Sequence, residues 1–97
     1  MKTGEELLQE LASLKPEICS RFKAKRIGLF GSFVRGDQEE MSDVDLLVEF
    51  AEGADLLDFV GLSDFLEEQL HRRVDLATIR SLKPRFRDRV LAEVAML

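Results

Sequence analysis

A glycine-serine pair, followed at a fixed distance by two aspartates, is the feature that most constrains what this chain can fold into. Gly31 and Ser32 follow the short apolar run 26–30, and Asp43 and Asp45 open a second apolar run. Because side chains alternate across a strand, the two aspartates would share one side of it. Glycine lets a backbone approach a phosphate closely, and serine adds a hydroxyl and an amide where a helical turn begins. The stretch therefore predicts a divalent-metal half-site beside a phosphate-binding turn.

A third carboxylate could complete this site. Asp75 interrupts the otherwise apolar run 73–78. Magnesium is usually held by one or two carboxylates together with substrate phosphates, and two ions about 3.5 to 4 Å apart can stabilise the attacking and leaving oxygens of an in-line displacement. We therefore take Asp75 as the candidate third ligand. The alternative is a carboxylate at a strand end that faces Arg72 or Arg73.

The remaining polar residues near the turn have competing interpretations. Arg35 lies one turn after Ser32 and could neutralise charge on a leaving pyrophosphate, or it could form an ion pair with Asp37 or Glu39. Glu93 is expected to be a surface residue of the last helix. No pairing of side chains suggests a nucleophile within the chain, so the attacking group is expected to come from the acceptor substrate.

Apolar residues at helical spacing predict the helices. A first helix is expected at about Gly4–Ser13, and Pro16 either begins a second segment or kinks a continuous helix that ends near residues 23–25. A later helix, capped by Asp55, reaches Leu70, and the last helix begins at Pro84. The positions expected to face a sheet are Leu56, Phe59, Val60, Leu62, Phe65, Leu66 and Leu70 in the former, and Phe86, Val90, Leu91 and Val94 in the latter.

Three apolar runs predict the strands: Arg26–Phe30, Val44–Phe50 and Arg73–Thr78. A helical turn at Ser32–Arg35 and a polar loop at Asp37–Ser42 separate the first two. The order helix, strand, turn, strand, helix, strand, helix predicts an α/β or α+β fold, in which helices pack against a small mixed sheet. Parallel and antiparallel neighbours are both compatible with this pattern.

Length and composition limit the classes of function. We expect the 97 residues to form a single domain, too small to add a separate domain for recognising an acceptor. No apolar run approaches the roughly 18 residues that span a membrane, and Glu5, Glu6 and Glu10 interrupt any signal peptide. A cytoplasmic protein without membrane contact is expected. Cys19 is the only cysteine and allows no internal disulfide.

Charge is distributed unevenly along the chain. The net charge of -5 makes nucleic acid an improbable partner. No Lys or Arg occurs between Gly36 and His71, whereas the stretch from Arg72 to Arg89 is rich in basic residues. This pattern favours an acidic metal-binding end beside a basic surface that could meet a triphosphate or an acidic partner.

These residues carry a family resemblance. Gly31-Ser32, ten intervening residues and then Asp43-x-Asp45 resemble the signature of the DNA polymerase beta-like nucleotidyltransferase superfamily. The fuller strings GSFVRG and SDVDLLV resemble its smallest members, the minimal nucleotidyltransferases encoded beside HEPN-domain partners. The resemblance extends through Asp75 and covers most of the chain, so it implies a polymerase beta-like core.

The resemblance also implies roles for the site. Gly31 and Ser32 would hold the phosphates of the nucleotide, with Arg35 as a further phosphate contact. Asp43 and Asp45 would bind two magnesium ions. By the same resemblance, Asp75 would bind the catalytic ion and help to deprotonate the acceptor hydroxyl.

For function, the resemblance implies a type VII-like antitoxin that transfers AMP from ATP to a tyrosine of its HEPN ribonuclease toxin. Two other activities stay open. The chain could be a non-catalytic, nucleotide-binding antitoxin that neutralises its toxin by direct binding, or it could transfer nucleotides to RNA or a small molecule. A homo-oligomer and a hetero-oligomer with the toxin are both compatible with the sequence.

Overall fold

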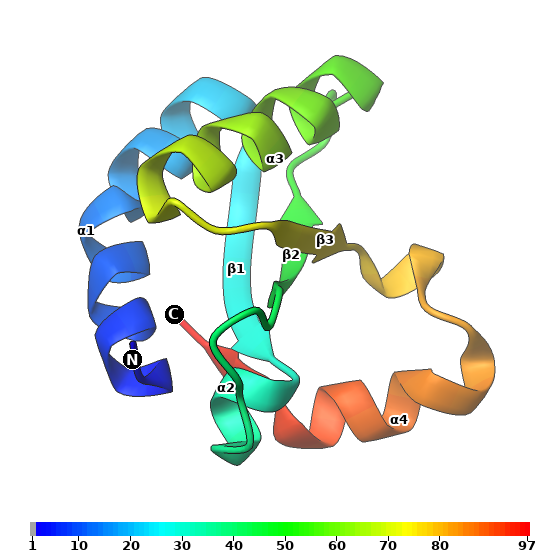
Figure 1. Cartoon of the computed structure of the whole chain (residues 1–97). Helices are drawn as coiled ribbons and strands as arrows, with labels where there is room; N and C mark the ends of the chain where they lie inside the picture. The colour runs from blue at the N-terminus through cyan, green and yellow to red at the C-terminus, as the bar shows by residue number, and fades with distance from the viewer. Residues whose placement is uncertain (1) are drawn as a thin grey trace.

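A four-stranded mixed sheet organises the chain (Figure 1). The computed structural model describes residues 2–97. The strands β1 (Ala24–Phe30), β2 (Val44–Phe50), β3 (Val74–Ala77) and β4 (Ala95–Met96) lie in the order β3-β2-β1-β4. β1 is antiparallel to both of its neighbours, β2 and β4, whereas β2 and β3 are parallel. The predicted mixed sheet with packed helices is confirmed, and β4 is a strand that the pattern did not predict.

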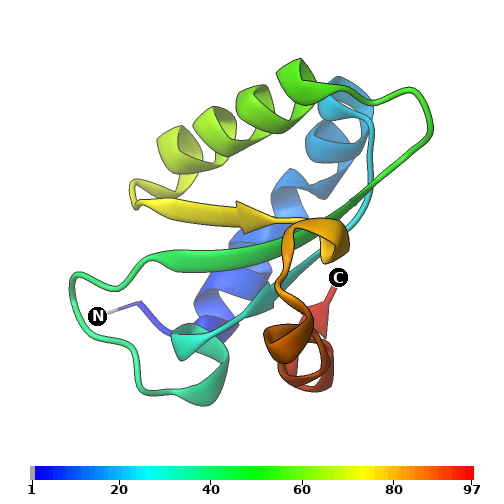
Figure 2. The ribbon, with the colours of Figure 1, turned by 90° about the vertical axis from the view of Figure 1, so that its right-hand side faces the viewer.

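The helices lie on both faces of this sheet (Figures 1 and 2). α1 (Gly4–Phe22) and α3 (Leu56–Leu70) cover one face, and α4 (Pro84–Glu93) lies on the other. The single turn α2 (Ser32–Arg35) connects β1 to the loop before β2, and the short 3-10 helix η1 (Ile79–Ser81) connects β3 to α4. Among residues 2–97, no helix is both long enough and apolar enough to cross a membrane.

The side chains of β2 alternate between the core beneath α1 and α3 and the opposite, open face of the sheet. Val44, Leu46 and Val48 are buried beneath α1 and α3, while Asp45 and Glu49 project to the face that α4 only partly covers. Burial of the apolar set gives the sheet its register, because a slip of one residue would bring the carboxylates into the core. The largest fully buried side chains are Leu7, Leu11, Ile18, Ile27, Leu29, Leu46, Leu62, Leu66, Leu70, Val44 and Val48.

α1 runs continuously through Pro16, which confirms the continuous helix that was one of the two interpretations of this proline, whereas the expected end of the first helix at Ser13 is wrong. Pro16 and Ala12 are both exposed, and water can solvate the carbonyl that loses its partner. The helix has buried apolar residues on both sides of the proline. The helix ends at Lys23, which adopts a left-handed conformation with a φ of 58°, and β1 therefore begins at Ala24, two residues earlier than predicted.

The apolar stripes of the later helices are narrower than predicted. Leu56 and Val60 at the start of α3 are 75% and 47% exposed, because they turn away from the stripe that packs on the sheet. In α4 only Val90 is buried; Phe86 and Leu91 are exposed, and Val94 lies beyond the last helical residue. One helix lying on part of a sheet face leaves most of its own surface in solvent.

Candidate active site

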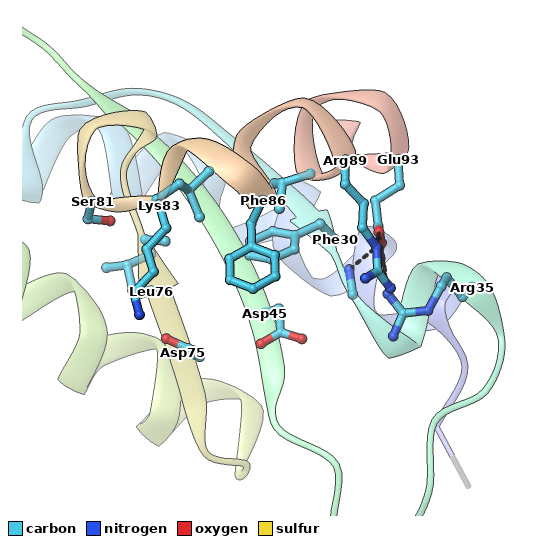
Figure 3. Close-up of a pocket in the computed structure, with 14 residues that line it drawn as sticks. Phe30, Arg35, Asp45, Asp75, Leu76, Ser81, Lys83, Phe86, Arg89 and Glu93 are labelled. Carbon is cyan, nitrogen blue, oxygen red and sulfur yellow. Dashed lines mark hydrogen bonds and ion pairs between the residues drawn. The ribbon is translucent and has the colours of Figure 1, made fainter.

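Two aspartates from neighbouring strands line one pocket of about 450 Å³ on the open face of the sheet (Figure 3). Asp45 and Asp75 are partners in the parallel register of β2 and β3. Neighbouring strands lie about 4.8 Å apart, and register partners project to the same side. The structure thus places Asp75 beside Asp45, as the hypothesis of a third carboxylate requires. No ion pair joins Asp75 to Arg72 or Arg73 within residues 2–97.

Asp43 lies at the edge of this arrangement. It precedes β2 by one residue, is exposed and lines a second hollow that contains Arg72 and Arg73. Its charge nevertheless acts on Asp45. The structure brings Asp45 and Asp75 into one pocket, with Asp43 beside it.

Burial and charge together perturb Asp45. Desolvation, followed by repulsion from Asp75 and Asp43, raises the pKa of the Asp45 carboxyl from 3.8 to about 6. Arg35 opposes this shift by attraction. Because the neighbouring carboxylates repel one another, a cation bound among them would be stabilised.

Gly31 meets Asp45 at close range. Its φ of 80° and ψ of -151° belong to a conformation that other residues rarely adopt. A Cβ atom built on Gly31 would lie 2.1 Å from Oδ2 of Asp45. The structure therefore requires glycine here for two reasons: the backbone conformation and the approach of the carboxylate. Ser32 follows as the first residue of α2.

Glu93, expected on the surface, instead contacts the turn, so that prediction is wrong. Its Oε2 accepts a hydrogen bond from the Gly31 amide at 3.0 Å, and its side chain is only 17% exposed. Sequence reasoning missed it because 62 residues separate the two partners and no local pattern links them.

Arg35 has the ion pair that was one of its two interpretations, and it also lines the pocket. Its Nε donates to Asp37 at 3.3 Å, and its Nη1 donates to Glu93 at 3.1 Å. The hydrogen bond with Asp37 is the largest cause of the raised pKa of the Arg35 guanidinium. Phosphate binding by Arg35 stays a prediction.

Residues from the last third of the chain also line the pocket, among them Lys83, Phe86 and Arg89 (Figure 3). None of these three was singled out as a site residue from the sequence. The basic stretch from Arg72 to Arg89 was the available signal, because it predicted a basic surface near the acidic end. Phe86 is 43% exposed, and its ring points toward Asp45 in the close-up view.

The donor set suits a hard cation. Among residues 2–97, no three Asp, Glu, His or Cys side chains are gathered closely enough to hold a metal ion by themselves. Magnesium does not require such a group, because substrate phosphates normally supply part of its coordination. Asp45 and Asp75 offer the usual pair of carboxylates, and a cation would relieve the repulsion that raises the pKa of Asp45. The residues therefore fit a magnesium site that nucleotide phosphates complete.

Comparisons with known proteins agree on one family. The model of the nucleotidyltransferase domain matches residues 11–96. The chain is 47% identical over 94 residues to the protein adenylyltransferase MntA of Thermococcus cleftensis, covering 97% of this chain and 95% of that relative.

Solved structures share the fold. A structure assigned as a minimal nucleotidyltransferase superposes with a TM-score of 0.81 at 41% identity, covering 97% of this chain and 95% of the other. A second match lies in a complex of the tri-AMPylated HEPN toxin of Shewanella oneidensis with an MNT antitoxin. Its TM-score is 0.63 at 25% identity, with 93% of this chain and 69% of the other covered.

Proposed function

The chain belongs to the nucleotidyltransferase domain family, and we propose that it transfers AMP from ATP to a tyrosine hydroxyl of a HEPN-domain toxin and thereby acts as an antitoxin. One observation carries the proposal: Asp45 and Asp75 lie side by side against the Gly31 turn, in one pocket, within a chain 47% identical to a protein adenylyltransferase. The proposal treats residues 1–97 as one minimal domain that works in the cytoplasm, where ATP is available.

In this proposal the acceptor oxygen attacks the α-phosphorus of ATP, the bond to the β-phosphate oxygen breaks, and pyrophosphate leaves. Asp43, Asp45 and Asp75 would hold magnesium, which would supply positive charge for the phosphate oxygens. Asp75 is the more exposed of the two pocket carboxylates, and it would take the proton of the acceptor hydroxyl. The Gly31–Ser32 turn and Arg35 would orient the phosphates.

The direct test is transfer of label to the partner. We expect the chain, incubated with its HEPN partner, magnesium and ATP labelled in the α-phosphate, to label a tyrosine of that partner. ATP labelled in the γ-phosphate is the matched control, because its label leaves with pyrophosphate. A chain that neutralises the toxin but transfers no label with any metal or nucleotide would be a binding antitoxin. Label on RNA instead of protein would show that the acceptor is a nucleic acid.

The apolar side of the pocket suits a nucleoside, and Phe86 would be the surface on which the base stacks. The guanidinium of Arg85 lies 4.9 Å from the ring centroid, and Phe86 is 43% exposed, so a base would stack on the part of the ring that stays open. Because stacking on an aromatic ring contributes roughly 1 to 3 kcal/mol per base, we expect Phe86→Ala to raise the KM for ATP about tenfold while kcat changes little.

The matched control for Phe86→Ala is Leu91→Ala, which removes an equally exposed apolar residue of α4 that does not line this pocket. Steady-state kinetics of AMP transfer should show a normal KM for Leu91→Ala and for Phe86→Tyr. Equal KM values in Phe86→Ala and the wild type would mean that the base binds elsewhere.

A further inference from the structure

Glu93 joins three segments that are far apart in the sequence. It is the last residue of α4, and its carboxylate receives hydrogen bonds from the Gly31 amide at 3.0 Å and from Nη1 of Arg35 at 3.1 and 3.3 Å. Arg89 approaches the same carboxylate at 3.9 Å. The dashed lines of Figure 3 converge on Glu93 at the end of the pocket where α2 begins. The turn, Arg35 and α4 are therefore connected through one side chain.

The position of Glu93 is fixed by the backbone on both sides. On one side, the Val94 amide donates to the Val90 carbonyl and closes α4. On the other side, β4 pairs with β1, and the Leu97 amide donates to the Ile27 carbonyl. With its backbone held between a helix end and a strand, Glu93 can leave the turn only by rotation of its side chain, which breaks its hydrogen bonds to Gly31 and Arg35. Glu93 thus belongs to the framework of the site.

The bond to Gly31 supports a turn that requires glycine. Gly31 adopts a conformation that few other residues tolerate. Because it is also buried, its amide depends on an acceptor within the protein. A buried donor without a partner is costly, and a carboxylate is a strong acceptor. Glu93 thereby fixes the turn that contacts Asp45 on one side and begins α2 on the other.

The bond to Arg35 orients a cation at the pocket. Nε of Arg35 donates to Asp37 and Nη1 donates to Glu93, whereas Nη2 has no hydrogen bond within residues 2–97. Two anions thus hold the guanidinium plane and leave the two N–H groups of Nη2 for a ligand. A planar guanidinium fixed in this way suits recognition of phosphate oxygens.

We infer that Glu93 is a positioning residue of the nucleotide site: it holds the Gly31–Ser32 turn and Arg35 in the arrangement that receives the phosphates. This inference rests on the proposed function. The competing interpretation makes Glu93 an internal anion that phosphate must displace. The fixed backbone of Glu93 and the two N–H groups left on Nη2 of Arg35 favour positioning. The two interpretations predict opposite changes in nucleotide affinity.

The experiment compares Glu93→Ala and Glu93→Gln with the wild type. Calorimetry measures the Kd of AMP-PNP with magnesium, and AMP transfer gives kcat and KM. We expect Glu93→Ala to weaken binding about tenfold and to lower kcat by a similar factor, because the turn and Arg35 both lose their support. Glu93→Gln should lie between, because its amide oxygen still accepts from Gly31 while the charge that orients Arg35 is lost.

A matched control variant and an Arg35→Ala background distinguish the contact of Glu93 with Gly31 from its contact with Arg35. Glu49→Gln removes the negative charge of a similar pair, with Arg26 at 2.8 Å, on the same face but outside the pocket, and should behave as the wild type. In an Arg35→Ala background, Glu93→Gln should cause little further loss of affinity, whereas Glu93→Ala should still weaken binding through the turn. A loss of affinity from Glu93→Gln that is present with Arg35 and absent without it would show that Glu93 acts through Arg35, which a purely structural role would not produce.

Each remaining outcome has a defined meaning. Glu93→Ala or Glu93→Gln with wild-type or tighter affinity for AMP-PNP would overturn the inference in favour of a competing anion. If the wild type binds AMP-PNP but labels no acceptor, the proposed function fails while the binding comparison still tests Glu93. A wild-type chain that binds no nucleotide overturns both. If Glu93→Ala does not fold, the isosteric Glu93→Gln provides the test.

Discussion

Replacing Asp45 with asparagine should abolish AMP transfer. Asp45 lies between Asp75 and the Gly31 turn, and it is the carboxylate most perturbed by its surroundings. Asparagine keeps its shape but removes the charge that would hold magnesium. Stabilisation by a bound metal contributes several kcal/mol to the transition state, so we expect a loss of about a thousandfold in the rate of labelling.

The control for Asp45→Asn is Glu49→Gln, which neutralises a carboxylate on the same face of β2 outside the pocket. It should transfer AMP at the wild-type rate. If Asp45→Asn transfers AMP normally, Asp45 is not a metal ligand and the assignment of the site is wrong. If Asp45→Asn is inactive and still neutralises the toxin, binding alone accounts for the antitoxin effect.

The loss of activity in Asp45→Asn should not come from unfolding. The pKa of Asp45 is raised to about 6 in the folded chain, so the folded state binds this proton more readily than the unfolded state. The ionised carboxylate therefore lowers the stability of the metal-free chain above that pH, and the cost fades as the pH falls towards 3.8. With EDTA, Asp45→Asn should melt at a higher temperature than the wild type at about pH 8, and the difference should shrink by about pH 4.5.

Local patterns were enough to predict most of the fold and the first half of the site. The period of two in β2 predicted that Asp45 would project away from the core, and burial of Val44 and Leu46 agrees. The pattern could not determine that β3 pairs with β2 in parallel. That pairing, which places Asp75 opposite Asp45, depends on the helix that crosses between the two strands.

The parts that sequence reasoning missed depend on contacts across the whole chain. β4 is only two residues long, too short for an alternating pattern, and it forms because β1 offers it an edge. From the sequence alone, Glu93 looks like a solvated helix residue. Its contact with Gly31 arises only in the fold, where β4 fixes the backbone next to it. Phe86 lies at helical spacing from the buried Val90, but it is 43% exposed and lines the pocket instead of the core, which the spacing alone could not show.

Replacing Gly31 with alanine should both destabilise the chain and inactivate it. The residue has a φ of 80°, and the new Cβ would lie 2.1 Å from Oδ2 of Asp45, so the turn or the carboxylate must move. The backbone strain alone costs roughly 1 to 3 kcal/mol. Displacement of Asp45 from the pocket would remove the pair of carboxylates, so we expect AMP transfer to fall at least about a hundredfold. Urea unfolding and labelling rates measure the two effects.

The two causes of this damage can be separated by Gly53→Ala. Gly53 also has a positive φ, of 91°, but no atom lies within 4 Å of a Cβ built there, and it does not line the pocket. Gly53→Ala should therefore lose stability through strain alone and retain its rate of AMP transfer. If Gly31→Ala loses no more activity than Gly53→Ala, the close approach to Asp45 has no functional consequence. A much larger loss in Gly31→Ala would show that the glycine is required because a catalytic carboxylate occupies the space of its missing side chain.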